Sequence, residues 1–315
     1  MEQVHFGCRI ETGVPDYETT ADLARQAEAV GYDSVWIRDH VAMPEVTADP
    51  NCLECFTTLA ALARDTKRVQ LGTLVVCTPW RNPALLAKMG ATIDVLSGGR
   101  LILGLGAGSF GLRREFDRYG WQILPNADRI RSLGESIQII RKMWTEDAPS
   151  FQGRYHRIQE AVCAPKPKQR PHPPIFVGAS GEQFALRNAV RYGDGWNSAV
   201  MYDEYVQKVE TVNRYCDEIG RDPATLVRSV NHVVIVDKPE RAKERLEALV
   251  ASKPGQPYLR RRTIAGGPEE VAERIRPFLA LGANWFITYF WETDPGAQRD
   301  NIAAFGSEVL PLFRS

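Results

Sequence analysis

The chain has 315 residues, with 39 basic and 39 acidic side chains and a neutral net charge. This length suffices for one large core or two modest ones, and the balanced charge argues against nucleic acid or an anionic membrane as a partner. No apolar window approaches the ~20 residues that span a bilayer, and the N-terminus lacks a signal-peptide pattern. We therefore expect a soluble cytoplasmic protein.

Short apolar runs alternate with amphipathic helical patterns along nearly the whole chain, and the first predicted helices are 17–31, 56–66, 83–99 and 127–144. Eight runs predict strands: 4–10, 34–40, 69–76, 100–108, 174–180, 195–200, 229–236 and 284–290. Several are continuously apolar, as expected for parallel strands that are covered on both faces. About eight such units in this length predict a single (β/α)8 TIM barrel over residues 1–315.

Two segments interrupt the alternation. Residues 149–174 are polar and rich in proline, which predicts an insert. Residues 252–265 fit no helix or strand pattern and contain Arg260, Arg261 and Arg262. This second segment is either a solvated basic loop or a lid over an anionic ligand.

The glycine-rich stretch LILGLGAGS (101–109) resembles the opening of a dinucleotide-binding fingerprint. A Rossmann fold places such glycines after its first strand, with an acidic residue ~20 positions later. Here the glycines follow the fourth predicted strand, and residues 126–130 read as the start of a helix. The doubly wound sheet is therefore the less favoured alternative to the barrel.

The cysteines give no sign of a metal site. Six are scattered along the chain, and only Cys52 and Cys55 form a C-x-x-C pair. Zinc would require a second pair or histidines at ligand spacing, and neither follows. We predict free thiols and no bound metal.

Asp39 and His40 close the second predicted strand. Catalytic residues of TIM barrels lie at the carboxyl ends of the strands, and a histidine there can act as general acid or base near neutral pH. The alternative is an Asp–His pair that only caps the next loop.

Other strand ends carry glycines and aromatic residues. Residues 177–182 read as a strand, a glycine-rich turn and a helix start, where unpaired N–H groups favour a phosphate, although an ordinary tight turn would look the same. Trp80 and the pair Trp196–Asn197 could line a flat ring system or merely pack loops.

Together these segments resemble the bacterial-luciferase-like flavin-dependent oxidoreductases, and most closely the branch that uses the deazaflavin coenzyme F420. The resemblance rests on six segments in this order: DSVWIRDH (33–40), residues 53–63, 68–108, 129–144 and 164–182, and YGDGWN (192–197). It implies a (β/α)8 barrel with the coenzyme at the carboxyl ends of the strands. It also implies a non-proline cis peptide between Leu74 and Val75.

The resemblance further implies roles for single residues. His40 would face the substrate as the catalytic acid or base, and Asp39 would hydrogen-bond the polar part of the coenzyme. The other coenzyme contacts would be Leu74, Val75, Cys77, Gly106, Ala107, Gly108, Gly178, Ala179, Ser180 and Gly181. The substrate pocket would include Ser109, Trp80, Trp196 and Asn197.

The coenzyme decides the chemistry. A deazaflavin has carbon where FMN has N5, so it transfers hydride and does not readily activate oxygen. The Asp39–His40 ending resembles the deazaflavin branch, which favours F420-dependent hydride transfer to or from a small organic substrate. An FMN-dependent monooxygenase and a non-catalytic flavin-binding protein are the alternatives. The family also implies a homodimer and a separate enzyme that reduces F420 or FMN.

Ser109 departs from the pattern of F420-dependent glucose-6-phosphate dehydrogenases, which carry a proton-transferring glutamate at this position. The sequence also shows no convincing counterpart of their basic sugar-phosphate pocket. Both features argue against a sugar-phosphate dehydrogenase and leave the substrate open.

Overall fold

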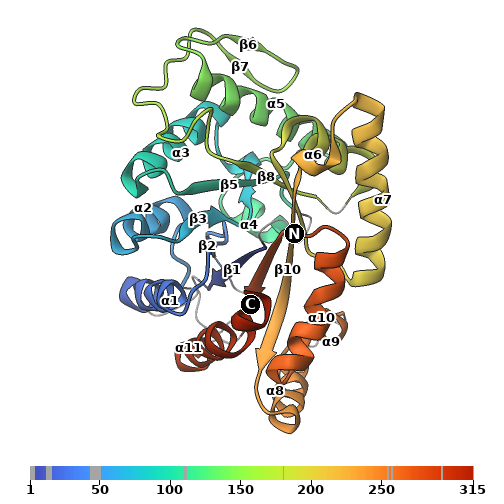
Figure 1. The fold of residues 1–315 in the computed structure, drawn as a ribbon. Helices are drawn as coiled ribbons and strands as arrows, with labels where there is room; N and C mark the ends of the chain where they lie inside the picture. The colour runs from blue at the N-terminus through green and yellow to red at the C-terminus, as the bar shows by residue number, and fades with distance from the viewer. Residues whose placement is uncertain are drawn as a thin grey trace.

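The computed structural model describes residues 4–11, 16–42, 51–109, 112–179, 181–253, 255–256, 258–291 and 294–314. Eight parallel strands pair in a closed ring, in which each strand pairs with the next and the last pairs with the first (Figure 1). In ring order they are β1 (His5–Ile10), β2 (Ser34–Ile37), β3 (Gln70–Thr73), β5 (Leu101–Gly106), β8 (Ile175–Gly178), β9 (Gly195–Ser198), β10 (Val227–Val236) and β12 (Trp285–Tyr289).

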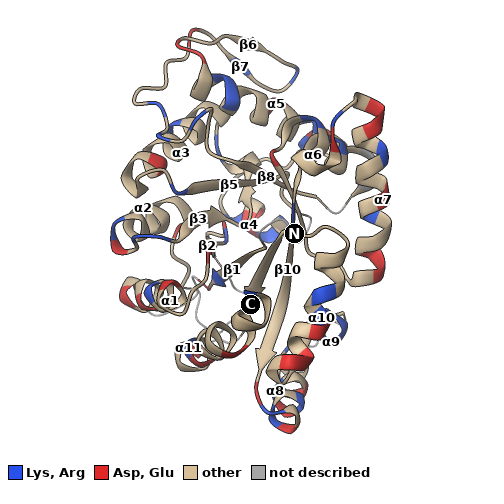
Figure 2. Ribbon diagram, viewed as in Figure 1, with Lys and Arg blue, Asp and Glu red and all other residues tan. Residues whose placement is uncertain are grey.

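Helices form the outer layer around this ring (Figure 1). They include α1 (Tyr17–Ala29), α2 (Cys55–Asp65), α3 (Pro83–Ser97), α5 (Asn126–Thr145), α6 (Arg187–Tyr192), α7 (Tyr202–Ile219), α8 (Pro239–Ser252), α10 (Pro268–Ala280) and α11 (Pro295–Ala304). Lys, Arg, Asp and Glu residues gather on these helices, while the strands are mostly uncharged (Figure 2). The predicted (β/α)8 TIM barrel is confirmed. None of the described helices is long and apolar enough to cross a membrane.

Large side chains fill the inside of the barrel, as in other TIM barrels. The indole of Trp36 occupies the space above two glycines, because a Cβ at Gly7 or Gly72 would lie 2.4 Å and 2.1 Å from its ring atoms. Trp36 and Trp285 meet edge to face at 6.2 Å, and both donate hydrogen bonds to the Ser34 hydroxyl. The inside of the barrel is therefore a packed core.

The third predicted strand is divided in two. It was expected to run over 69–76, but β3 ends at Thr73 and a short strand β4 (Val76–Cys77) follows. The cis peptide implied between Leu74 and Val75 lies at the break. β4 pairs with the end of β5, so residues 76 and 77 move from the end of β3 towards the next strand.

The segment 252–265 was expected to have no regular structure, and this was wrong. It contains a short helix α9 (Leu259–Arg262) and the start of strand β11 (Thr263–Gly266), which pairs with β10. The reason is the length of β10, whose residues 233–236 run beyond its pairing with β9 and leave an edge that β11 covers.

The segment 149–174 holds a small hairpin of β6 (Phe151–Gln152) and β7 (Arg157–Ile158). Its end is tied to α3, because the Asp94 carboxylate accepts hydrogen bonds from the backbone N–H groups of Lys168 and Gln169. A further helix, α4 (Arg113–Arg118), was not predicted, since six residues are too few to show a helical period.

Candidate active site

The carboxylate of Asp39, two residues after β2, is almost fully buried and already has strong partners. It accepts two hydrogen bonds from Arg81, of 2.6 Å to Nη1 and 2.9 Å to Nη2, and one of 2.9 Å from the Cys77 N–H. Arg81 also donates to Glu54 at 2.6 Å. Burial alone would lower the pKa of Arg81, but its bonds to Asp39 and Glu54 raise that pKa above its ordinary value. Asp39 therefore fixes β4 against the end of β2.

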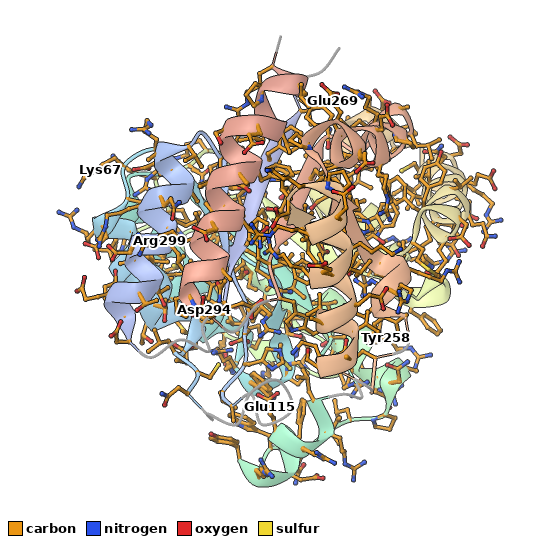
Figure 3. The ribbon with its side chains drawn as sticks, turned by 90° about the horizontal axis from the view of Figure 1, so that it is seen from below. Lys67, Glu115, Tyr258, Glu269, Asp294 and Arg299 are labelled. Carbon is orange, nitrogen blue, oxygen red and sulfur yellow. The ribbon has the colours of Figure 1, made fainter. Side chains whose placement is uncertain are left out.

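His40 is held by a residue that the sequence analysis did not identify. Its ring Nδ1 lies 2.8 Å from Oε1 of Glu115, on α4. The other carboxylate oxygen accepts the backbone N–H groups of Val41 at 3.0 Å and Ala42 at 3.4 Å. Figure 3 shows Glu115 on the side of α4 that faces the rest of the molecule. One carboxylate thus fixes both the imidazole and the backbone that follows it.

The charge of Glu115 determines which tautomer His40 adopts. Burial alone would raise the pKa of Glu115, but the hydrogen bonds from His40, Val41 and Ala42 hold that pKa below its ordinary value. An ionised carboxylate only accepts hydrogen bonds, so Nδ1 of His40 carries the proton. Nε2 is then the ring nitrogen that can exchange a proton with a substrate.

The glycines at the ends of β5 and β8 make room for Val75. A Cβ added at Gly106 would lie 2.7 Å from Cγ2 of Val75, and one at Gly178 would lie 2.9 Å from the same atom. At Gly104 the obstacle is backbone, because a Cβ there would lie 2.0 Å from the Thr73 carbonyl oxygen. The side chain of Val75 therefore lies against two neighbouring strand ends, those of β5 and β8.

The two predicted coenzyme loops follow these glycines. Gly108 has a φ of 73°, and a Cβ there would lie 3.0 Å from Sγ of Cys77, so the loop after β5 passes close to β4. In the loop after β8, Ala179 donates its N–H to the Asn197 carbonyl. A Cβ at Gly181 would meet no atom within 4 Å in the described structure. Ser180 lies outside the described residues.

The predicted pocket residues do not all come together. Trp80 lies near the loop after β5, where its ring stacks on Trp121 at 5.0 Å and packs on Phe116, the neighbour of Glu115. Trp196 instead packs outward against α7, with its ring stacked on Tyr205 at 5.6 Å. The structure therefore brings Trp80, but not Trp196, close to the His40–Glu115 pair.

Asn197 and Ser109 complete the predicted pocket set. Nδ2 of Asn197 donates to the hydroxyl of Ser229 on the adjoining β10, at 2.8 Å. The Ser109 carbonyl accepts the N–H of Leu112 and so forms part of the turn into α4. That turn is what brings Glu115 back to His40.

Two buried polar atoms fit an anionic, hydrogen-bonding coenzyme at this rim. Nε of Arg129 and Nε1 of Trp80 have no hydrogen-bond partner among the described residues. Arg129 is almost fully buried, and its charge acts on the Cys77 thiol of β4. A buried hydrogen-bond donor without an acceptor costs free energy. A ligand that accepts hydrogen bonds from these two donors would remove that cost.

Comparison with known proteins gives the family. The model of the luciferase-like monooxygenase family matches residues 2–259. The chain belongs to that family. An F420-dependent glucose-6-phosphate dehydrogenase of Amycolatopsis mediterranei is 30% identical, over 93% of this chain and 94% of that protein. An F420-dependent hydroxymycolic acid dehydrogenase of Mycobacterium tuberculosis is 31% identical, over 89% of this chain and 74% of that protein.

A solved structure of an F420-dependent secondary alcohol dehydrogenase, in complex with an F420-acetone adduct, has the same fold. It superposes with a TM-score of 0.85 at 23% sequence identity and covers 99% of this chain and 100% of that chain. The luciferase-like barrel is thus shared along the whole length. Within this family barrel, the described residues include no group of three or more His, Cys, Asp or Glu that could hold a metal ion.

Sequence reasoning missed Glu115 and did not assign Arg81 as the partner of Asp39. Arg81 follows Trp80 in the stretch 68–108, so its charge next to a strand end was a usable signal. Glu115 gave no such signal, because it lies 75 positions from His40, in a helix that is too short to be recognised from the sequence.

Proposed function

We propose that this member of the luciferase-like family is an oxidoreductase that uses coenzyme F420 to move a hydride to or from a small organic substrate. Two relatives that are 30% and 31% identical carry F420-dependent dehydrogenase names, which supports the coenzyme. The observation that carries the proposal is the buried carboxylate of Glu115 on Nδ1 of His40, at the carboxyl end of β2. This is where TIM barrels place their acid–base groups.

The residues of this chain have separate tasks in the proposed reaction. His40 gives or takes the substrate proton through Nε2, and Glu115 keeps the ring in the tautomer that leaves Nε2 available. Arg81 holds Asp39 and, through the Cys77 N–H, the position of β4.

Several residues would hold the coenzyme. Backbone of the two glycine loops, Gly106–Gly108 and Gly178–Gly181, would contact it together with Leu74, Val75 and Cys77, and Arg129 would be available for its anionic part. When bound, F420 supplies a ring carbon that carries the hydride and that reacts poorly with oxygen. The family resemblance adds a homodimer, a cytoplasmic location and a separate F420-reducing enzyme to the proposal.

Titration of the purified protein with F420 and, separately, with FMN tests the proposal. Micromolar binding of F420, followed through the fluorescence of the deazaflavin, is the expected result, with FMN much weaker. Binding of FMN alone would overturn the proposal and favour a monooxygenase. Binding of F420 without hydride exchange on any alcohol or acid offered as substrate would indicate a coenzyme carrier instead.

A further inference from the structure

A cavity of about 290 Å³ lies on the outside of the barrel, against β10 and β11. We call it the outer cavity. Its lining comes from the N-terminal end of α7 (Met201 and Tyr202), from His232 and Ile264 of the two strands, and from α9 and α10. None of the described residues that line it belongs to the His40–Glu115 pair or to the proposed coenzyme loops.

His232 is a buried polar residue in the wall of the outer cavity. It is 3% exposed, and its Nδ1 lies 3.3 Å from the carbonyl oxygen of Arg262. A carbonyl oxygen only accepts hydrogen bonds, so Nδ1 carries a proton. The other ring nitrogen, Nε2, is buried and has no hydrogen-bond partner among the described residues.

Nε2 of His232 is a hydrogen-bond acceptor at neutral pH. Burial lowers the pKa of His232 to about 4, the charges of Arg262 and Arg274 lower it further, and the hydrogen bond to the Arg262 carbonyl opposes this only in part. A neutral imidazole that donates from Nδ1 has a lone pair at Nε2. Because a buried acceptor without a donor costs free energy, the group that fits here is one that donates a hydrogen bond.

Aromatic and aliphatic side chains line the outer cavity beside His232. The ring centres of His232 and Phe278 are 4.8 Å apart, and Tyr202 meets Phe278 edge to face at 5.3 Å. Phe278 and Ile264 are buried. Aromatic rings pack favourably on one another, and an apolar cavity of about 150 Å³ can hold benzene. The outer cavity therefore has the walls and the volume for one small aromatic ring.

The charged residues of the lining do not require a charged occupant. Arg261 and Glu273 are exposed, and the Arg261 guanidinium lies 3.6 Å from the carboxylate of Asp203. Nη2 of the exposed Arg274 donates to the Thr263 carbonyl at 3.1 Å. Charges on exposed side chains are stabilised by water, so these residues need no counter-ion inside the cavity. Their exposure shows that the cavity is open to solvent on this side.

We propose that the outer cavity binds a small neutral aromatic molecule with a hydroxyl or N–H group, which donates a hydrogen bond to Nε2 of His232. The ring of this ligand packs on Phe278 and Tyr202. The site goes beyond the proposed function and does not rest on it, because His232 packs on the outer helix α10 and faces out of the barrel.

The test is titration of the full chain with phenol and, separately, with toluene, followed by NMR of the imidazole nitrogens. Toluene has the shape of phenol but no hydrogen to donate. The variant His232→Phe keeps a ring against Phe278, removes Nε2 and identifies the His232 signals by their loss. His156→Phe is the matched control, because His156 lies outside the cavity and its Nε2 already has a partner in the Ser132 hydroxyl.

We expect saturable binding of phenol that shifts the Nε2 signal of His232, and no such shift with toluene. One neutral hydrogen bond changes an affinity by about three- to tenfold. The ratio of phenol affinity to toluene affinity should therefore be three- to tenfold higher in wild type than in His232→Phe. His156→Phe should keep the wild-type ratio.

Three results would overturn the proposal. Absence of saturable phenol binding would mean that water alone serves Nε2, an equal affinity ratio in wild type and His232→Phe would exclude the hydrogen bond, and a response at His40 alone would place phenol at the rim. If His232→Phe does not fold, the wild-type comparison of phenol with toluene at Nε2 of His232 decides. Failure of F420 to bind would contradict the proposed function and leave this site unaffected.

Discussion

Nδ1 of His40 and Oε1 of Glu115 lie 2.8 Å apart, although the two residues are 75 positions apart in the chain. Six residues before Glu115 stands Ser109, where the family resemblance implies an acid in glucose-6-phosphate dehydrogenases. In this chain the carboxylate near the rim comes from α4 and contacts the histidine. This arrangement makes Glu115 a positioning residue for His40.

Replacing Glu115 with Gln should lower kcat while the Kd for F420 stays unchanged. The amide cannot accept from His40 and from both backbone N–H groups in the same way, so the tautomer of His40 is no longer fixed. Loss of this charge-assisted bond should cost about tenfold or more in kcat. Steady-state kinetics and nitrogen NMR of the imidazole measure the two effects.

The matched control for Glu115→Gln is Asp117→Asn, on the same helix, which removes an exposed carboxylate that pairs with Arg113. It should leave kcat and the His40 tautomer unchanged. A Glu115→Gln enzyme with the tautomer and kcat of wild type would show that Glu115 only supports the fold.

Replacing His40 with Ala should abolish proton transfer and retain the coenzyme. General acid–base catalysis by one side chain contributes about 10²–10⁴-fold, and kcat should fall by that factor. F420 binding, measured by titration, should persist because the proposed coenzyme loops lie on β5 and β8. His156→Ala is the control, since His156 bonds to Ser132 on α5. Unimpaired turnover in His40→Ala would rule out the catalytic role.

The stability of the protein should depend on the ionisation of Glu11. Burial alone would raise the pKa of Glu11, but Arg38 and Arg9 hold that pKa below its ordinary value. A depressed carboxyl pKa contributes stability that is fully present above the unfolded-state pKa of about 4.3 and is lost as the pH falls through the folded-state pKa. Wild type should therefore lose stability in acid through this group.

Glu11→Gln removes the carboxylate from between the buried Arg9 and the partly buried Arg38 and should lower the free energy of unfolding by about 3–5 kcal/mol at pH 7. The difference from wild type should shrink as the pH falls below that unfolded-state value. Urea titrations at several pH values measure this difference. The exposed Glu18→Gln should show little difference at any pH, and a Glu11→Gln difference that is constant with pH would contradict the assignment.

Gly106→Ala should destabilise the barrel through Val75. The added methyl group would lie 2.7 Å from Cγ2 of Val75, and overpacking of this kind costs about 1–3 kcal/mol. In a Val75→Ala background the cost should largely disappear, as a double-mutant cycle of urea unfolding would show. Gly104→Ala meets the Thr73 carbonyl instead, so Val75→Ala should not rescue it. If Gly106→Ala lowered the free energy of unfolding equally in the wild-type and Val75→Ala backgrounds, the contact with Val75 would not be the cause.

The sequence by itself determined the barrel and the strand end at which Asp39 and His40 lie. Both follow from local information. The alternation of apolar runs and amphipathic segments predicts the strands and helices, and the end of the second apolar run gives the position of Asp39 and His40. The cis peptide at Leu74–Val75 followed from the resemblance of the whole stretch 68–108. The break of that strand into β3 and β4 did not show in its continuous apolar pattern.

Only the tertiary structure decided which partners these residues have. Glu115 reaches His40 and Arg81 reaches Asp39 because closure of the ring and the turns between elements bring distant segments to one rim. The sequence also did not indicate whether the side chain of Trp196 points into the barrel or outward. A strand that is covered on both faces has no polar side that would mark which residues point inward. Contacts between distant residues depend on the whole packing, and no local pattern contains them.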